Sequence, residues 1–189
     1  MTEPAIAALL EQRRPARADA RRNFDALVEA GRDVFAESGI DASLEEIARR
    51  AGVGIGTLYR NFATRDALVE AVYLEEVAGV AAYADELDGR APFDAFAAWM
   101  RRFAAYGSTK KVLLEGLSRD SEVMQACRGV VNSAGEPLLL RAQDAGDLRS
   151  DITIDDAIRL VYGLAGVAVV DPAQADLLIT IALDGLRAR

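Results

Sequence analysis

Histidine is absent from the 189 residues of this chain, and cysteine occurs once, at Cys127. Without a second cysteine the chain forms no internal disulfide, and a zinc site of the usual cysteine and histidine type is strongly disfavoured. Paired-carboxylate motifs and cofactor fingerprints are also missing, so a helical enzyme is the weakest hypothesis, and we expect no cofactor and no metal. Cys127 is interpreted as a small buried apolar residue in a protein of a reduced compartment.

Long apolar runs are missing as well. The longest covers residues 160–170, well short of the roughly 20 residues that span a bilayer. The first fifteen residues, MTEPAIAALLEQRRP, lack the basic start of a signal peptide. We therefore expect a cytoplasmic protein without membrane contact.

Aromatic residues make up only 6% of the chain, although half of its residues are hydrophobic. Because aromatic and β-branched residues favour strands, this composition favours helices, and no strand-like alternation persists. The sequence predicts an all-α protein, with a proline at position 137 that kinks or ends a helix. The predicted helices cover residues 18–38, 44–51, 54–61, 64–87, 92–105, 109–117, 121–143, 155–169 and 172–186.

The segment AGVGIGTLYRNF (residues 51–62) fits two kinds of phosphate-binding element, a nucleotide loop and a DNA-reading helix. A dinucleotide loop needs a preceding strand and a third glycine where Thr57 stands, while a P-loop needs Gly-Lys-Ser/Thr. Instead, Ser43 and Glu46 form a predicted capping box, which begins a short helix that Gly52 ends. Two short helices joined by this turn predict a helix-turn-helix.

The second helix of this motif has an inner and an outer face. Its inward apolar residues are predicted to be Val53, Leu58 and Phe62. Its outward residues, whose groups suit phosphates and base edges, are Thr57, Tyr59, Arg60 and Asn61. A glycine in place of alanine weakens a helix by about 1 kcal/mol, but Gly54 and Gly56 leave a bare face that lets the backbone lie close to a DNA groove.

Residues 43–72, SLEEIARRAGVGIGTLYRNFATRDALVEAV, closely resemble the DNA-binding segment of the tetracycline-repressor (TetR) family of bacterial transcription regulators. The match extends over roughly residues 20–73, and its most specific part is Gly-Thr-Leu-Tyr-x-x-Phe after the capped helix. PFDAFAAWMRRFAAYGSTKKVLLEGL resembles the SbtR-like subgroup of C-terminal domains in that family. Gly54 stands where the family often has serine, and Asn61 where histidine or tyrosine is common.

The resemblance implies that Thr57 and Tyr59 hold phosphates, while Ile55 and Arg60 read a thymine methyl and a guanine. Helix N-termini favour phosphate, and arginines at the start of the first helix suit backbone or minor-groove contact. The predicted DNA-binding residues are Arg21, Arg22, Ser43, Gly54, Ile55, Gly56, Thr57, Tyr59, Arg60, Asn61 and Arg65.

Three parts are predicted: a flexible N-terminal arm (1–17), a three-helix helix-turn-helix domain (18–64) and a helical domain for ligand binding and dimerisation (65–189). Residues 1–65 carry ten arginines against ten acidic residues, whereas residues 66–189 carry twelve basic and twenty acidic residues. The net charge of −8 therefore arises in the C-terminal part. It argues against a protein that coats nucleic acid nonspecifically.

A dimer is expected because one bidentate base contact discriminates by only ~1–3 kcal/mol, so regulator-grade specificity needs two heads on a palindromic operator. LVYGLAGVAVV (160–170) and ADLLITIALDGLRA (175–188) are apolar nearly all round, so both faces of each helix must be buried. We predict a four-helix arrangement with a second copy, the alternative being burial within one subunit. The predicted interface residues are Leu160, Gly163, Leu164, Val167, Leu178, Ile181 and Leu186.

An aromatic stripe follows the break at residues 88–92. The family resemblance implies that this region encloses a cavity for a small-molecule effector, whereas its helical spacing also fits plain core. The candidate ligand-binding residues are Phe96, Trp99, Met100, Phe103, Tyr106, Leu117, Met124 and Cys127. The leading hypothesis is a homodimeric repressor that a ligand releases from double-stranded DNA. The alternative is a helical scaffold that binds DNA and another protein, without a small-molecule pocket.

Overall fold

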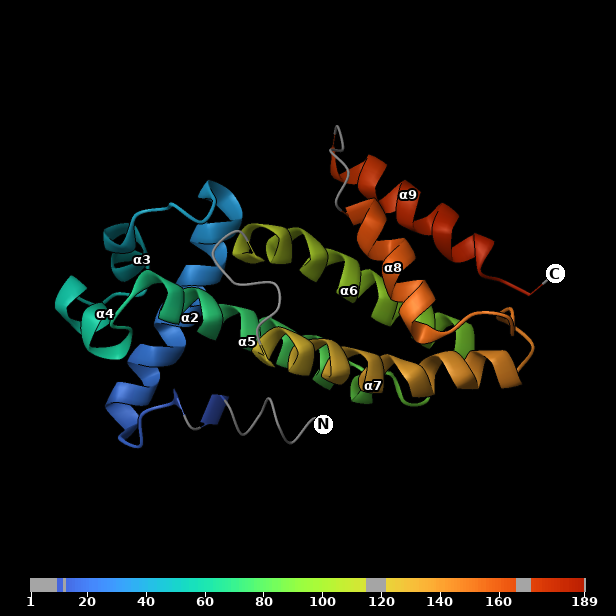
Figure 1. The fold of residues 1–189 in the computed structure, drawn as a ribbon, viewed down its shortest axis with the longest axis horizontal. Helices are drawn as coiled ribbons and strands as arrows, with labels where there is room; N and C mark the ends of the chain where they lie inside the picture. The colour runs from blue at the N-terminus through green and yellow to red at the C-terminus, as the bar shows by residue number, and fades with distance from the viewer. Residues whose placement is uncertain (1–9, 12, 115–121, 166–170, 189) are drawn as a thin grey trace. The chain divides into compact units, whose positions relative to one another are not determined.

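The computed structural model describes residues 10, 11, 13–114, 122–165 and 171–188, which are mostly helical (Figure 1). Within these ranges there is no strand, and only an isolated antiparallel bridge joins Leu148 to Arg187. The predicted all-α class is confirmed. In chain order the elements are α2 (Ala18–Ser38), α3 (Leu44–Arg50), α4 (Ile55–Asn61), α5 (Arg65–Tyr83), the 3-10 turn η1 (Asp85–Leu87), α6 (Pro92–Leu114), α7 (Glu122–Asp144), α8 (Ile154–Ala165) and α9 (Pro172–Gly185).

One predicted pair of helices is a single helix, and the structure decides between the two roles predicted for Pro137. Separate helices were expected over residues 92–105 and 109–117, but α6 is continuous from Pro92 to Leu114. Pro137 lies inside α7 and so does not end a helix there. Proline lacks the N–H donor of one helical hydrogen bond, but the helical turns before and after Pro137 remain intact.

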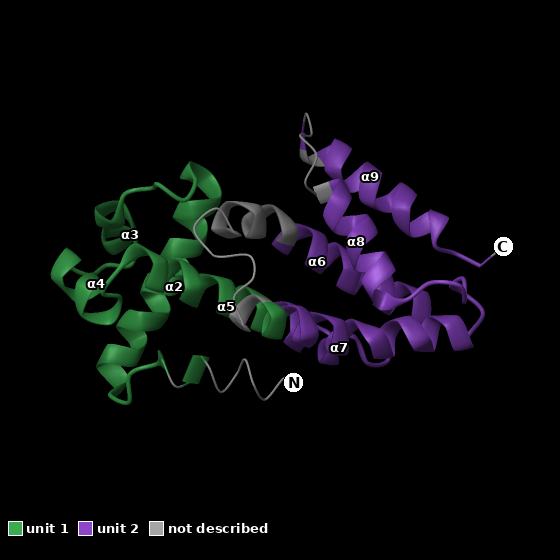
Figure 2. Ribbon diagram, in the orientation of Figure 1, with its two compact units in different colours: residues 1, 3–78, 109–127 green, residues 2, 79–108, 128–189 purple. Residues whose placement is uncertain are grey.

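The chain divides into two compact units (Figure 2). The first contains residues 3–78 and 109–127, and the second contains residues 79–108 and 128–189. This division lies further along the chain than the predicted boundary after residue 64, because the start of α5 packs in the first unit. A Cβ placed on Gly31 of α2 would lie 3.2 Å from Val72 Cγ2 of α5.

Residues 10, 11 and 13–17, within the predicted N-terminal arm, belong to the first unit and make contacts there. Leu10 is buried, which removes its apolar side chain from water. Arg13 and Arg14 form ion pairs with glutamates of α5 at 2.8 and 3.1 Å. Glutamates of α5 thus hold this segment in place, although its sequence is Arg-rich and polar.

The second unit is packed around Trp99 of α6, the single tryptophan of the chain, which is fully buried. Its Nε1 donates to the carbonyl oxygen of Val80 at 3.0 Å. Val80 lies in the last turn of α5, where carbonyls lack a partner further along the helix. The Trp99 side chain therefore supplies a hydrogen-bond donor to a carbonyl at the end of α5 and also fills the core of the second unit.

None of the described helices combines the length and the apolar character needed to cross a membrane.

Candidate nucleic-acid interface

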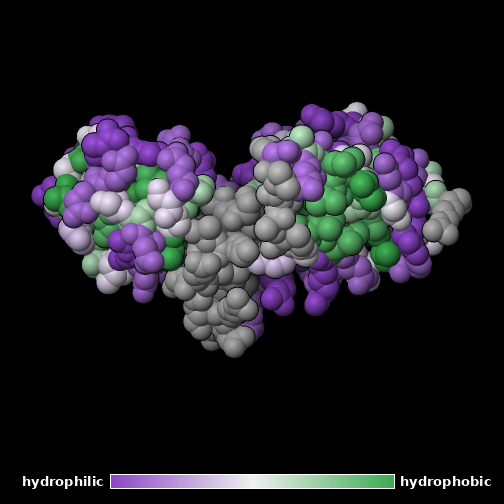
Figure 3. Space-filling model, turned by 90° about the horizontal axis from the view of Figure 1, so that it is seen from above, coloured by the Kyte–Doolittle hydropathy of each residue, from purple (hydrophilic) through white to green (hydrophobic). Residues whose placement is uncertain are grey.

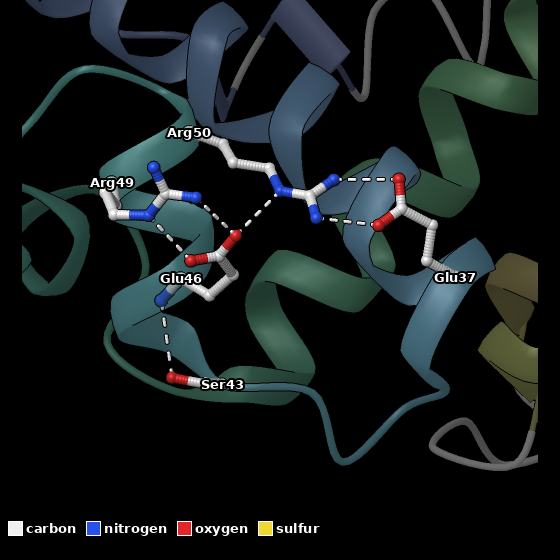
Figure 4. Close-up of polar contacts among 5 residues, drawn as sticks. All are labelled: Glu37, Ser43, Glu46, Arg49 and Arg50. Atoms are coloured by element: carbon white, nitrogen blue, oxygen red, sulfur yellow. Dashed lines mark hydrogen bonds and ion pairs between the residues drawn. The ribbon is translucent and has the colours of Figure 1, made fainter.

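The first helix of the turn motif, α3, begins at its predicted N-cap. Ser43 Oγ accepts a hydrogen bond from the backbone N–H of Glu46 at 3.3 Å, which confirms this half of the capping box. The Glu46 carboxylate accepts instead from Arg49 and Arg50, at 2.8–2.9 Å (Figure 4). The capping box is therefore only half formed, because two guanidinium groups compete for its glutamate.

The same glutamate belongs to an ion-pair network that joins α3 to α2. Arg50 donates from both terminal nitrogens to the two carboxylate oxygens of Glu37, at 2.8 and 2.7 Å (Figure 4). Hydrogen bonds from Arg49 and then Arg50 lower the pKa of Glu46 to about 2. The hydrogen bond to Arg50 likewise lowers the pKa of Glu37. Both carboxylates therefore stay charged at neutral pH.

The turn between α3 and α4 depends on a single glycine conformation. Gly52 has a φ of +70°, in the left-handed region that residues with a side chain rarely adopt. Its N–H donates to the Arg49 carbonyl at 3.1 Å, and the Val53 N–H donates to the Ala48 carbonyl at 3.0 Å. These hydrogen bonds connect the turn to the end of α3, so the start of α4 follows the position of that end.

The second helix, α4, is fixed from beneath by two apolar side chains. Leu58 is fully buried, and Phe62 packs its ring against that of Phe24 with centroids 4.9 Å apart. Val53, predicted to pack inward, is half-buried. A seven-residue helix has little stability of its own, so these contacts determine where its outer face points.

The outer face of α4 carries the predicted reading residues. Tyr59 is 51% exposed and Ile55 is 37% exposed. Thr57 anchors two neighbours, because its Oγ1 accepts from Arg60 Nη2 at 2.9 Å and its carbonyl accepts from Asn61 Nδ2 at 2.8 Å. The Arg60 guanidinium is thus held on the surface by a neighbouring hydroxyl.

Packing within the described residues requires neither Gly54, the N-cap of α4, nor Gly56 inside the helix. Gly54 has φ −75° and ψ 152°, an extended conformation that other residues adopt freely. A Cβ placed on Gly54 or on Gly56 would meet no heavy atom of the described residues within 4 Å. Glycine inside a helix is costly, which applies to Gly56, whereas Gly54 stands at the N-cap, where glycine is tolerated.

Three arginines predicted to contact DNA lie in different surroundings. Arg65 Nη1 donates to the carbonyls of Ile40 and Ala42, at 2.8 and 2.5 Å, and so holds the loop between α2 and α3. Arg21 forms a two-bond ion pair with Glu11, while Arg22 is exposed. The sequence could not predict that Arg65 holds this loop, because the hydrogen-bond acceptors of Arg65 are backbone carbonyls more than twenty positions away.

The α8 and α9 helices carry an exposed apolar face in the second unit, on the side viewed in Figure 3. Of the predicted interface residues, Leu160, Gly163 and Ile181 are exposed, and so is Leu177, which was not predicted. The half-buried ones are Leu164 and Leu178. Leu186 is buried within its own chain, and Val167 lies outside the described residues. The exposed part of the predicted face therefore excludes Leu186.

The candidate ligand residues of α6 are core residues. All five are buried, and the rings of Trp99 and Phe103 stack with centroids 6.0 Å apart. Cys127 is also buried, in the other compact unit. Leu117 and the side chain of Met124 lie outside the described residues. The five on α6 are Phe96, Trp99, Met100, Phe103 and Tyr106.

A short helix held on two others, with hydroxyl, aromatic and basic side chains facing outward, defines a helix-turn-helix DNA-binding protein. Residues 27–72 match the bacterial regulatory proteins of the tetR family, and residues 91–188 match the SbtR-like C-terminal domain of transcriptional regulators. The chain belongs to the TetR family of transcription regulators, which bind DNA and are not enzymes.

Two solved structures agree with this assignment. A TetR transcriptional regulator from Streptomyces coelicolor is 40% identical, over 87% of this chain and 98% of that one, with a TM-score of 0.76. A TetR transcription regulatory protein from Mycobacterium vanbaalenii is 31% identical, over 92% of this chain and all of that one, with a TM-score of 0.72. The likeness extends over both compact units.

Proposed function

We propose that this protein is a cytoplasmic homodimeric repressor, which binds a palindromic operator through α4 of each copy and leaves it when a small molecule binds the second unit. The outer face of α4 carries the DNA-binding part of the proposal. Ile55, Tyr59 and Arg60 are exposed, Thr57 and Asn61 are half-buried, and Gly54 and Gly56 leave open space next to the backbone. Such a face suits close approach to the major groove.

The side chains of α4 divide into two roles. Tyr59 and Thr57 offer hydroxyl groups that suit phosphate oxygens, which position a protein on DNA without reading its sequence. Arg60 offers a guanidinium for a guanine, and Ile55 an apolar contact for a thymine methyl. The hydrogen bond from Arg60 to Thr57 at 2.9 Å supports this division, because it orders the guanidinium before DNA arrives.

Substitutions on α4 test this assignment. We expect Tyr59→Ala to weaken binding of all duplexes, and Arg60→Ala to relax the preference at one base pair per half-site. The loss for the matched base should be about 1–3 kcal/mol per contact. Affinities for a duplex selected in vitro with the wild type, and for its single-base variants, measure both effects. Wild-type binding by both variants would show that α4 is not the reading helix.

Support for the dimer comes from the α8 and α9 face. Ile181 and Leu177 are each 57% exposed and lie one helical turn apart on α9. Exposed apolar residues gathered on two neighbouring helices are typical of a protein interface. A second copy that packs the same two helices against them gives a closed two-fold contact, which also supplies the second reading head.

Support for ligand control comes from the link between Trp99 and the end of α5. The indole donates to Val80 in the last turn of α5, and α5 begins at Arg65, separated from the end of the reading helix by three residues. An effector that moves Trp99 removes a hydrogen bond from a helix that continues into the first unit. Binding energy can thus bias the position of α5 and lower the affinity for DNA.

A metabolite screen distinguishes this proposal from a scaffold that a protein partner controls. We expect at least one compound to raise the thermal midpoint, change the emission of Trp99 and weaken operator binding. An effector present at 100 times its dissociation constant stabilises by about 2.7 kcal/mol. A protein partner that releases the operator, while no compound shifts Trp99 emission, would favour the scaffold.

A further inference from the structure

Arg50 occupies a junction between the two helices that precede the reading helix. It is the last residue of α3, while Glu37 lies in the last turn of α2. The guanidinium uses its two terminal nitrogens on Glu37 and its Nε on Glu46 Oε1, at 2.9 Å (Figure 4). Three donors of one side chain thus connect two carboxylates on two helices.

We propose that Arg50 is a positioning residue of the DNA-binding head: it fixes the end of α3 on α2, and thereby the direction of α4, without touching DNA itself. This inference rests on the proposed DNA-binding function. It assigns Arg50 a role different from that of the arginines predicted to contact phosphates, because its guanidinium holds two helices of the protein together.

The C-terminal end of α3 has no fully buried apolar residue, so polar contacts must hold it in place. Ala48 is the last fully buried residue of the helix. Beyond it, the turn is hydrogen-bonded back to Ala48 and Arg49, so that the start of α4 follows a movement of this end. The clasp between Arg50 and Glu37 acts at that point. Because Leu58 and Phe62 hold the rest of α4 in place, an error there tilts its N-terminal end, where Ile55 and Gly56 lie.

The charge balance of the network indicates that Arg50 is not a phosphate contact. Glu37 and Glu46 together neutralise Arg49 and Arg50, so the cluster carries no net charge. The side chain of Arg50 is 34% exposed, whereas that of Arg49 is 71% exposed and pairs within α3. An approaching phosphate meets Arg49 first, and taking Arg50 would require breaking its two-bond contact with Glu37.

A double-mutant cycle on DNA affinity tests the proposal. The variants are Arg50→Gln, Glu37→Gln and their combination, measured on the duplex selected with the wild type at several salt concentrations. Each single change should weaken binding by roughly tenfold in a dimer that carries it twice. The combination should be no weaker than either alone, and the slope of log K against log salt should equal that of the wild type.

A phosphate contact gives the opposite pattern. Arg50→Gln would then reduce the salt slope by about one in each head, while Glu37→Gln would leave binding unchanged or tighter by freeing the guanidinium. Either result overturns the positioning role. Arg50→Lys adds a second readout, because lysine keeps the charge but lacks the planar fork. We expect it to bind nearly as weakly as Arg50→Gln, and wild-type binding by Arg50→Lys would contradict the proposal.

Matched controls separate this inference from the proposed function. Arg49→Gln removes an arginine that pairs with the same glutamate but has no link to α2. Any loss of affinity that it causes should come with a lower salt slope, unlike the loss caused by Arg50→Gln. Circular dichroism of each variant verifies the fold. If Tyr59→Ala binds like the wild type, the DNA-binding assignment of α4 fails. If Tyr59→Ala is weak while Arg50→Gln binds normally, the positioning role alone fails.

Discussion

Ile181→Glu is expected to convert the protein into a monomer and to remove high-affinity operator binding. Ile181 is among the most exposed large apolar residues on α9. In the proposed dimer it becomes buried against the second copy, and two-fold symmetry places the new charge there twice. A buried, unpaired carboxylate is strongly unfavourable. Losing the second head should lower operator affinity by roughly 100-fold or more.

Light scattering at micromolar concentration, together with DNA affinity, measures both effects. Leu140→Glu is the matched control, because Leu140 is 49% exposed on α7, outside the α8 and α9 face. It should leave the dimer and DNA binding unchanged. If Ile181→Glu stayed dimeric, the interface would lie elsewhere on the surface. If the wild type were a monomer, the two-headed operator model would fail as well.

The second large effect is expected in the core of the second unit. A Cβ placed on Gly135 would lie 2.5 Å from Cη2 and 2.6 Å from Cζ3 of Trp99, and 2.8 Å from Cδ1 of Ile154. Gly135→Ala should therefore lower the free energy of unfolding by about 1–3 kcal/mol, the usual cost of overpacking. Trp99→Phe should also destabilise, because it leaves the Val80 carbonyl without its indole donor.

These two changes should partly compensate. Phenylalanine lacks the outer ring atoms that the new methyl group would meet, so the double variant should lose less stability than the sum of the two single variants. Denaturant unfolding of all three measures the coupling. Gly56→Ala is the control, since open space surrounds that glycine, and it should gain up to about 1 kcal/mol. A neutral Gly135→Ala would show that the packing around Trp99 is loose.

The features that depend on neighbouring residues were predictable. Ser43 caps α3 and Gly52 turns the chain because both act within a few positions. The spacing of Leu58 and Phe62 fixes the buried side of α4, and hence the exposure of Tyr59 on the other. Helical period and capping chemistry were sufficient for these, since neither needs knowledge of how helices pack.

The features that depend on packing were not predictable. Arg50 reaches Glu37 across thirteen positions, and Arg65 reaches backbone carbonyls of a loop. A long side chain can serve many partners, so spacing alone does not select one. Packing also decides which residues at the C-terminal end of the chain are buried. Ile179, Leu183 and Leu186 face their own subunit, whereas the sequence of α9 is apolar on all sides and does not say which side faces inward.

The open space around Gly54 and Gly56 has a consequence for how such a regulator diverges. A new side chain at either position meets nothing in the described part of its own chain, so the core imposes no compensating change. Single substitutions there should therefore change the proposed DNA contacts without disturbing the packing of α4. The same freedom makes these two positions the natural ones to randomise when engineering regulators that ignore each other's promoters.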